Sequence, residues 1–209
     1  LRSRGLQFAP DVATSSRANI GGMIGNNTAG TRSIIYGRTG DHVLGMRILL
    51  ADGTELRFSE IPDEEYEARS RGNSREAQIY GGVRGIVQRN HTHIEKRYPK
   101  VMRRVSGYAL DAFTNTTPWN LARLVTGSEG TLAITLEATI NLEPLPAFST
   151  LYVPHFPTIM DSIRAVKPLL GLGPAAVELL DDTVLNRARE NLATAPSCEF
   201  LEGSPGSIL

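Results

Sequence analysis

Alternating apolar and polar positions predict an antiparallel hairpin in the first third of the chain. Residues 43–51 are mainly apolar, Asp52-Gly53 follows, and residues 54–58 alternate between polar and apolar side chains. Asp-Gly between two such stretches is typical of a tight hairpin turn, because glycine readily adopts the positive φ that the turn requires. A further β-rich stretch covers residues 131–140, so another strand is expected there.

Helix-favouring sequence occupies much of the region between these strands. Residues 63–98 are expected to be helical up to Pro99. The acidic cluster from Asp63 to Glu67 suits a solvated helix start, because acidic side chains are favourable near a helix N-terminus. Residues 118–125 are expected to form a short helix, with Pro118 in its first turn.

Two prolines, Pro144 and Pro146, mark a boundary in the pattern. Beyond it, residues 149–153 and 175–180 are expected to be strands on either side of a helix over 158–170. This βαβ-like order favours the beginning of a second domain, and the fold class expected for the whole chain is α+β. The residues after 202 have turn chemistry and predict no further element.

A glycine-rich run, Ile20 to Gly30, is the most informative local feature. It has glycine at positions 21, 22, 25 and 30, with small or amide residues between them. Glycine lets the backbone pass close to a ligand, so the run is expected to be either a turn or a loop that contacts a cofactor. It matches neither G-x-G-x-x-G nor the G-x-x-x-x-G-K-[ST] phosphate loop.

Composition narrows the class of protein. The chain has 209 residues, and its 22 Lys and Arg balance its 22 Asp and Glu, which gives no indication of a nucleic-acid partner. No apolar run approaches the ~18 residues of a transmembrane span. The single cysteine, Cys198, excludes a disulfide within the chain. A cytoplasmic location is expected, with peripheral association with a membrane left open.

Four segments then occur in a distinctive order. They are Pro10-Asp11 with Ala18-Asn19-Ile20-Gly21-Gly22, Asn26-Asn27-Thr28-Ala29-Gly30, Tyr36–Val43 leading into Leu50–Thr54, and Leu124–Ile134 with its Gly127-Ser128-Glu129-Gly130-Thr131 core. Over roughly residues 8–145 the chain resembles the FAD-linked oxidases of the vanillyl-alcohol-oxidase/PCMH superfamily. The resemblance is strongest to the D-lactate, glycolate and D-2-hydroxyglutarate dehydrogenase branch.

The resemblance implies a fold and a domain organisation. Residues 1–145 would form the C-terminal part of a PCMH-type FAD-binding domain, and residues 146–209 would begin a ferredoxin-like cap domain. Arg103–Asp111 is similar to the family's R-R-x-x-G-Y-x-L-D segment, and residues 175–181 resemble the start of its cap. Both ends are expected to be cut from a longer protein.

The resemblance also implies which residues would bind FAD. The glycines of the run at 20–30 allow the backbone to approach a ligand closely, and its short polar side chains can form hydrogen bonds. Both features suit a flat cofactor with a polar edge. The cofactor-binding candidates are Pro10, Ala18, Ile20, Gly21, Gly22, Met23, Asn26, Thr28, Ala29, Gly30, Gly130 and Ile134. Asn26 and Thr31 depart from the residues usual at their positions in the family. Glu129 and Thr131 could instead be structural, with Ser128 as a capping residue.

The substrate side is less well defined. Arg103 or Arg104 could bind the carboxylate of a 2-hydroxy acid, because a guanidinium binds carboxylates bidentately. The basic stretch from Lys96 to Arg104 could equally be a solvated face, or pair with the acids at 63–67. Tyr108 could contact substrate, although a place in the core is favoured.

The functional expectation follows from the resemblance. The chain would be a fragment of an FAD-dependent oxidoreductase that oxidises a small 2-hydroxy acid by hydride transfer to flavin N5. The electrons would pass to an electron acceptor or to a fused iron–sulfur module. Two alternatives stay open: another PCMH flavoenzyme, such as an alcohol oxidase or a nicotinamide-dependent reductase, or a catalytically inert structural fragment that binds no FAD.

Neither a catalytic base nor a metal ligand is assigned within the chain. The family's cap residues of that kind are expected beyond Leu209, so the isolated fragment is expected to be inactive. His91 and His93 could face a metal together, but they lie in a polar helical segment without a nearby cysteine or paired acid. Surface histidines are the favoured interpretation.

Overall fold

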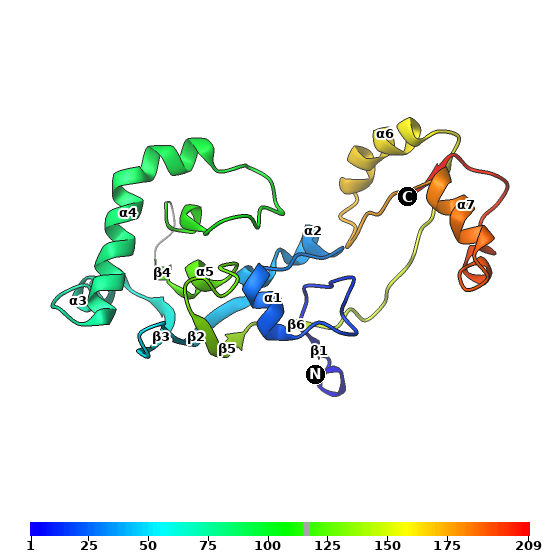
Figure 1. Ribbon diagram of the computed structural model, residues 1–209. Helices are drawn as coiled ribbons and strands as arrows, with labels where there is room; N and C mark the ends of the chain where they lie inside the picture. The colour runs from blue at the N-terminus through cyan, green and yellow to red at the C-terminus, as the bar shows by residue number, and fades with distance from the viewer. Residues whose placement is uncertain (115–117) are drawn as a thin grey trace. The chain divides into compact units, whose positions relative to one another are not determined.

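The structure is a computed structural model that describes residues 1–114 and 118–209 (Figure 1). The chain divides into two compact units, Leu1–Leu145 and Pro146–Leu209. Within the described residues, none of the helices combines the length and the apolar character that crossing a membrane requires.

An antiparallel sheet with the strand order β4-β3-β2-β5 is the centre of the first unit. Its strands are β2 (Val43–Leu49), β3 (Glu55–Ile61), β4 (Trp119–Asn120) and β5 (Ile134–Ile140). Leu49 pairs with Glu55, which confirms the predicted hairpin. At its turn Gly53 has φ 85°, and Asp52 Oδ1 accepts a hydrogen bond of 2.9 Å from Thr54 N. A second pair, β1 (Leu6–Gln7) with β6 (Glu143–Pro144), joins the two ends of the unit.

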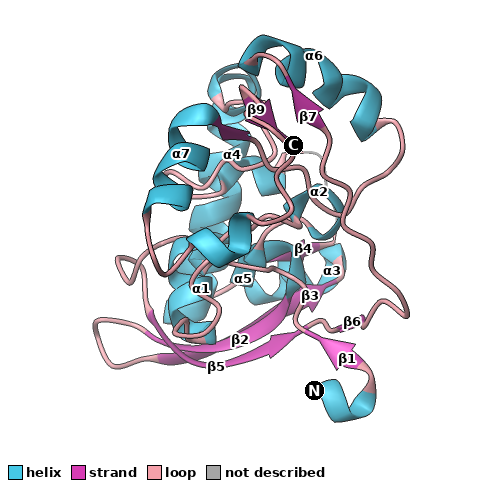
Figure 2. Ribbon diagram, turned by 90° about the vertical axis from the view of Figure 1, so that its right-hand side faces the viewer, coloured by secondary structure: helices cyan, strands magenta, loops and turns pink. Residues whose placement is uncertain are grey.

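Helices cover one face of this sheet. Figure 2 shows α1 (Ile20–Asn26) and α5 (Ala122–Val125) over strands β2 and β5. The other elements of the unit are α2 (Ser33–Tyr36), α3 (Asp63–Arg69), α4 (Arg75–Arg97) and the 3₁₀ helices η1 (Arg2–Arg4), η2 (Thr39–His42) and η3 (Leu110–Phe113). Helices and sheet enclose one apolar core, with Ile48, Leu121 and Tyr66 at most 1% exposed.

Three sequence predictions for this unit are wrong in detail. The glycine-rich run is not an open loop, because residues 20–26 form α1. The helix predicted over 63–98 is two helices, separated near Gly72, whose φ is 96°. The helix predicted over 118–125 begins only at Ala122, because Trp119 and Asn120 pair with β3 instead.

An aromatic cluster anchors α3 and α4 to the sheet. Tyr66 packs edge-to-face against Tyr80 and Trp119, and the Arg84 guanidinium lies 4.2 Å from the Tyr66 ring centroid and 5.1 Å from that of Trp119. Arg84 also forms ion pairs with Asp63, at 3.4 Å, and with Glu67. The acidic cluster therefore pairs inside its own helical region and not with the basic stretch at 96–104.

Replacing Arg84 with methionine is expected to lower the free energy of unfolding by about 1–2 kcal/mol. The change removes a cation–π contact and leaves Asp63 and Glu67 without their partner. Chemical denaturation measures the effect. Arg89→Met is the matched control, because Arg89 is an exposed arginine of the same helix, and a loss as large as that of Arg84→Met would contradict the prediction.

The second unit contains a three-stranded sheet with the order β7-β9-β8. Its elements are β7 (His155–Phe156), α6 (Ile159–Leu170), β8 (Leu180–Asp181), α7 (Asp182–Glu190), η4 (Ala195–Cys198) and β9 (Ser207–Ile208). The helix predicted over 158–170 is confirmed, and Thr158 caps it by accepting a hydrogen bond from Asp161 N. Both outer strands run antiparallel to β9 and hence parallel to each other.

The strand predictions for this unit are wrong in position. Residues 149–153 form no strand, and the first strand begins at His155. Of the predicted strand at 175–180, only Leu180 is in a strand. No element was predicted for residues 207–208, but they form the central strand, because they pair with both β7 and β8.

Candidate functional site

A cleft with a volume of about 760 Å³ opens in the first unit, where three of the sequence segments meet. The segments are the end of α1 with the residues after it, the loop before η3, and the turn after α5. The lining residues are Asn26, Asn27, Thr28, Ala29, Arg103, Val105, Ser106, Gly107, Tyr108, Gly127, Ser128, Glu129 and Thr131. Segments about 100 positions apart in the sequence thus form one surface.

Backbone hydrogen bonds hold the turn after α5 against the end of α1. Gly127 N donates to Ile24 O and Glu129 N donates to Gly25 O, each at 2.9 Å. The last carbonyls of a helix have no partners within the helix, so these bonds complete the C-terminus of α1. Gly127 and Glu129 both have positive φ, of 83° and 52°, which turns their amides toward the helix. The glycine-rich run and the Gly-Ser-Glu-Gly turn are therefore held together by hydrogen bonds.

Asn27 joins the end of α1 and the turn after α5 to the segment at 36–43. It follows α1 in the left-handed conformation, with φ 52°, and its side-chain Oδ1 accepts a 2.8 Å hydrogen bond from Gly40 N. Its Cβ also packs against Gly127, where an added Cβ would lie 3.1 Å from the Asn27 Cβ. Asn27 belongs to the Asn26–Gly30 motif but is not among the individual cofactor-binding candidates predicted from the sequence. The available signal was an asparagine directly after a short apolar helix, because asparagine enters the left-handed region more readily than most residues.

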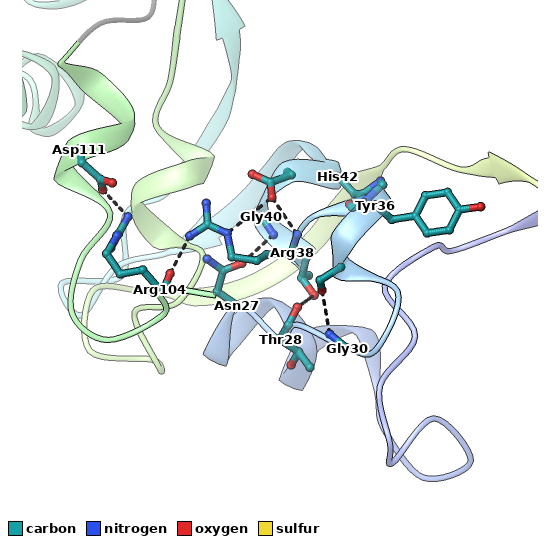
Figure 3. A network of polar contacts seen from close by, with 12 residues as sticks. Asn27, Thr28, Gly30, Tyr36, Arg38, Gly40, His42, Arg104 and Asp111 are labelled. Carbon is teal, nitrogen blue, oxygen red and sulfur yellow. Dashed lines mark hydrogen bonds and ion pairs between the residues drawn. The ribbon is translucent and has the colours of Figure 1, made fainter. Parts of the chain in front are cut away.

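A chain of polar contacts supports the wall of the cleft (Figure 3). Asp41 accepts a hydrogen bond from Arg38 N at 2.8 Å, and Arg38 Nη1 donates to Arg104 O at 2.6 Å. The Arg104 guanidinium pairs in turn with Asp111. The Tyr36–Val43 segment therefore positions the Arg103–Asp111 segment from behind the cleft.

The two neighbouring arginines differ in environment. Arg103 is exposed and lines the cleft. Arg104 is only 8% exposed, and its guanidinium lies 4.9 Å from the Tyr98 ring centroid while it pairs with Asp111. Arg104 is thus part of the wall, so of the two arginines proposed for a substrate carboxylate only Arg103 has a guanidinium available to the cleft.

Tyr108 lines the cleft and is 40% exposed, so the interpretation that it fills the core is wrong. Its hydroxyl lies 2.9 Å from Thr131 Oγ1, which donates to Ser128 O at 2.6 Å. Its carbonyl accepts a 2.9 Å hydrogen bond from the Tyr98 hydroxyl. Burial raises the pKa of Tyr98 above its ordinary value, with the nearby Asp111 charge adding to the shift, which keeps that hydroxyl protonated as a donor.

The predicted cofactor residues fall into distinct positions. Asn26, Thr28 and Ala29 line the cleft, and Gly130 lies between two lining residues. Ile20, Gly21 and Gly22 are exposed on α1, Ala18 is partly exposed before it, and Ile134 begins β5 with an exposed side chain. The buried members of the set are Pro10, Met23 and Gly30.

Gly30 has a structural reason to be glycine. A Cβ at this position would overlap the carbonyl oxygen of Asp11. The same oxygen accepts a hydrogen bond of 3.2 Å from Thr31 N. Gly30 N in turn donates to Ser33 Oγ at 2.9 Å. The close approach at Gly30 is therefore to the chain itself. A Cβ at Gly21 or Gly22 would meet no atom within 4 Å.

The histidines proposed as surface residues lie on α4. His91 Nδ1 is 3.6 Å from Glu95 Oε2, and its Nε2 is 3.2 Å from Thr114 O. The part of the chain that the structure describes contains no group of three histidine, cysteine or acidic side chains arranged to hold a metal ion.

Comparison with known proteins identifies relatives of the whole chain. Residues 1–59 match the family described as "FAD binding domain". The D-2-hydroxyglutarate dehydrogenase of Escherichia coli is 34% identical over 98% of the chain, and that of Pseudomonas putida is 32% identical over 98%. The chain covers 20% of each of these proteins and therefore spans about a fifth of their length.

Further proteins show more distant similarity to the chain. The glycolate oxidase subunit GlcD of Bacillus subtilis is 27% identical over 88% of the chain, which covers 29% of that protein. The solved structure of an alkyldihydroxyacetonephosphate synthase has a similar fold, with a TM-score of 0.53 and 16% identity over 90% of the chain and 25% of that structure. In its motifs and in its relatives, the chain is similar to the FAD-linked oxidases of the vanillyl-alcohol-oxidase/PCMH superfamily.

Proposed function

We propose that the cleft is part of the FAD site of an oxidoreductase that oxidises a small 2-hydroxy acid. The single observation that carries this proposal is the meeting of residues 26–29, 103–108 and 127–131 in one cleft. These are the segments that carry the family resemblance. The relatives named D-2-hydroxyglutarate dehydrogenase make D-2-hydroxyglutarate the first substrate to test.

The residues of the cleft fit a flavin dinucleotide. The volume of about 760 Å³ is within the range of pockets that take large organic ligands. Gly107 and Gly127 present backbone without side chains, which allows a flat group to approach closely. Asn26 and Thr28 supply short polar side chains, and Arg103 and Glu129 supply both signs of charge.

We assign each part of the cleft a role in binding. Asn26, Thr28 and Ala29 would hold the cofactor on one side, and the backbone around Gly130 would hold it on the other. Arg103 would bind the carboxylate of the substrate. When bound, FAD would supply a hydride acceptor at N5 for the hydrogen on C2 of the hydroxy acid. The electrons would leave through a separate acceptor or an attached iron–sulfur module.

We also propose identities for the two units. The first, 1–145, would be the C-terminal part of a PCMH-type FAD-binding domain, which the match of residues 1–59 supports. The second, 146–209, would begin a ferredoxin-like cap. In favour of this, β7 and β8 run parallel with one strand between them, and α6 follows β7 in the sequence.

Arg103→Gln is expected to weaken substrate binding, whereas Arg104→Gln is expected to lower the stability of the fold. Loss of the exposed Arg103 should weaken hydroxy-acid binding by about tenfold, because it removes a charge-assisted contact, and should leave unfolding unchanged. Loss of Arg104 should lower the free energy of unfolding by about 2 kcal/mol, because it leaves Asp111 without its partner. Anaerobic titration of the FAD-loaded protein and thermal unfolding measure the two effects. Equal changes in both assays would contradict the assignment.

The activity itself is tested by anaerobic reduction of bound flavin. We expect D-2-hydroxyglutarate, D-lactate or glycolate to bleach the flavin absorbance of the FAD-loaded parent enzyme, whereas the isolated fragment is expected to be inactive. Bleaching only by an alcohol or a nicotinamide would favour another PCMH flavoenzyme. A folded chain that takes up no FAD would favour an inert structural fragment.

A further inference from the structure

A second hollow, with a volume of about 430 Å³, adjoins the cleft in the first unit. It lies where the chain leaves α4. The part of its lining that the cleft does not share consists of Arg97, Tyr98, Pro99, Val101 and Arg104. Arg103, Val105 and Ser106 line both cavities. We call this second cavity the basic hollow.

Unmatched positive charge gathers around the basic hollow. Lys96, Arg97, Lys100 and Arg103 are all exposed, and none of them has an ion pair with a carboxylate of residues 1–114 or 118–209. Two of these cations, Lys96 and Arg97, lie in the last turn of α4, where the helix dipole favours them. That reason does not apply to Lys100 and Arg103, which follow the helix. In a chain whose charges balance overall, this cluster is a local excess.

The base of the basic hollow is held in place. Arg104, which also lines it, pairs with Asp111 and stacks on Tyr98, and its carbonyl accepts a 2.6 Å hydrogen bond from Arg38. Tyr98 is fixed at both ends, because its amide donates to Ile94 O and its hydroxyl donates to Tyr108 O. A site whose walls are already ordered loses less entropy when it binds a ligand.

We propose that the basic hollow binds the carboxylate or phosphate group of a small anion between Arg97 and Arg103. Guanidinium groups bind both kinds of oxyanion bidentately, and neither of these two is occupied by a carboxylate among the described residues. Tyr98, Pro99 and Val101 offer an apolar wall for the rest of such a molecule. Because Arg103 lines both cavities, an anion in the basic hollow competes with the cleft for this side chain.

The test is a titration of the flavin-free, ¹⁵N-labelled protein with inorganic phosphate and, separately, with citrate. Sodium chloride at equal ionic strength is the reference. We expect saturable shifts of amide resonances within 97–106 for at least one of the two anions, and their comparison separates phosphate from carboxylate chemistry. Arg97→Gln is expected to weaken this binding by about tenfold. The matched control Arg89→Gln, on the same helix, should leave it unchanged.

Three results would overturn the proposal. They are shifts that chloride reproduces, the absence of saturation with both anions, and an equal loss of affinity in Arg97→Gln and Arg89→Gln. Circular dichroism of each variant verifies that it is folded, and Arg103→Gln provides a second variant of the same hollow. The measurement contains no FAD, so a failure of the proposed flavin site leaves its outcome unaffected.

Discussion

Gly30→Ala is expected to destabilise the first unit severely. The added Cβ would overlap the backbone carbonyl of Asp11, and a backbone atom cannot move aside as the end of a flexible side chain can. Overpacking against a fixed group costs about 1–3 kcal/mol or more, and here it would also disturb the hydrogen bonds of Gly30 and Thr31. We expect a loss of stability of at least about 3 kcal/mol, measured by chemical denaturation.

Gly21→Ala is the matched control for this prediction. It replaces a glycine of the same run, but its Cβ would meet no atom within 4 Å and it lies inside α1. Alanine is favoured over glycine in a helix by up to about 1 kcal/mol, so this variant should be as stable as the wild type or slightly more stable. If both variants unfolded alike, the distinction drawn between the two glycines would be wrong.

Asn27→Ala is expected to have the second largest effect. It removes the acceptor for Gly40 N and places alanine in a left-handed conformation, with φ 52°. An unsatisfied donor costs about 1–3 kcal/mol, and the strained backbone adds about 1 kcal/mol. We therefore expect a loss of about 2–4 kcal/mol. FAD affinity should fall as well, because Asn27 lines the cleft and holds the Gly127 turn beside it.

Asn27→Gly separates the two contributions. Glycine accepts the positive φ without strain, so only the hydrogen bond to Gly40 is lost. The variant should be more stable than Asn27→Ala but less stable than the wild type, in thermal and chemical unfolding alike. If it were less stable than Asn27→Ala, the left-handed conformation of residue 27 would not be the cause of the strain.

Local sequence signals were sufficient where a single segment determines its own structure. The hairpin of β2 and β3 follows from its alternating pattern and from Asp52-Gly53, both of which act within a few residues. Helix α6 begins directly after Thr158, whose side chain caps it as a local pattern can indicate. In these elements propensity and tertiary structure agree.

Elements that depend on distant partners could not be predicted in this way. Trp119 and Asn120 are a strand because β3 is available to pair with them, and residues 207–208 are a strand because both β7 and β8 are. The glycine-rich run suggested a loop, yet α1 forms because amides of Gly127 and Glu129 satisfy its last carbonyls. Glycine alone disfavours a helix, and here the tertiary contacts outweigh that preference.

The candidate site could be predicted as a set of segments but not residue by residue. The motifs pointed to Asn26, Thr28, Ala29 and Arg103, which line the cleft. They did not distinguish Arg103 from Arg104, because only the Asp111 pair and the Tyr98 ring show that Arg104 is buried. They also could not show that Gly30 must be glycine because of Asp11, since that contact joins residues on either side of α1.

If residues 26–29, 103–108 and 127–131 form a flavin-binding cleft, as we propose, the folded protein binds FAD. The most direct measurement is a titration of FAD with the folded protein, followed by flavin fluorescence and by the absorbance near 450 nm that is typical of flavins. We expect saturable binding that perturbs the flavin spectrum and that weakens in Asn27→Gly. Unchanged flavin spectra in the presence of folded protein, or equal binding by wild type and Asn27→Gly, would contradict it.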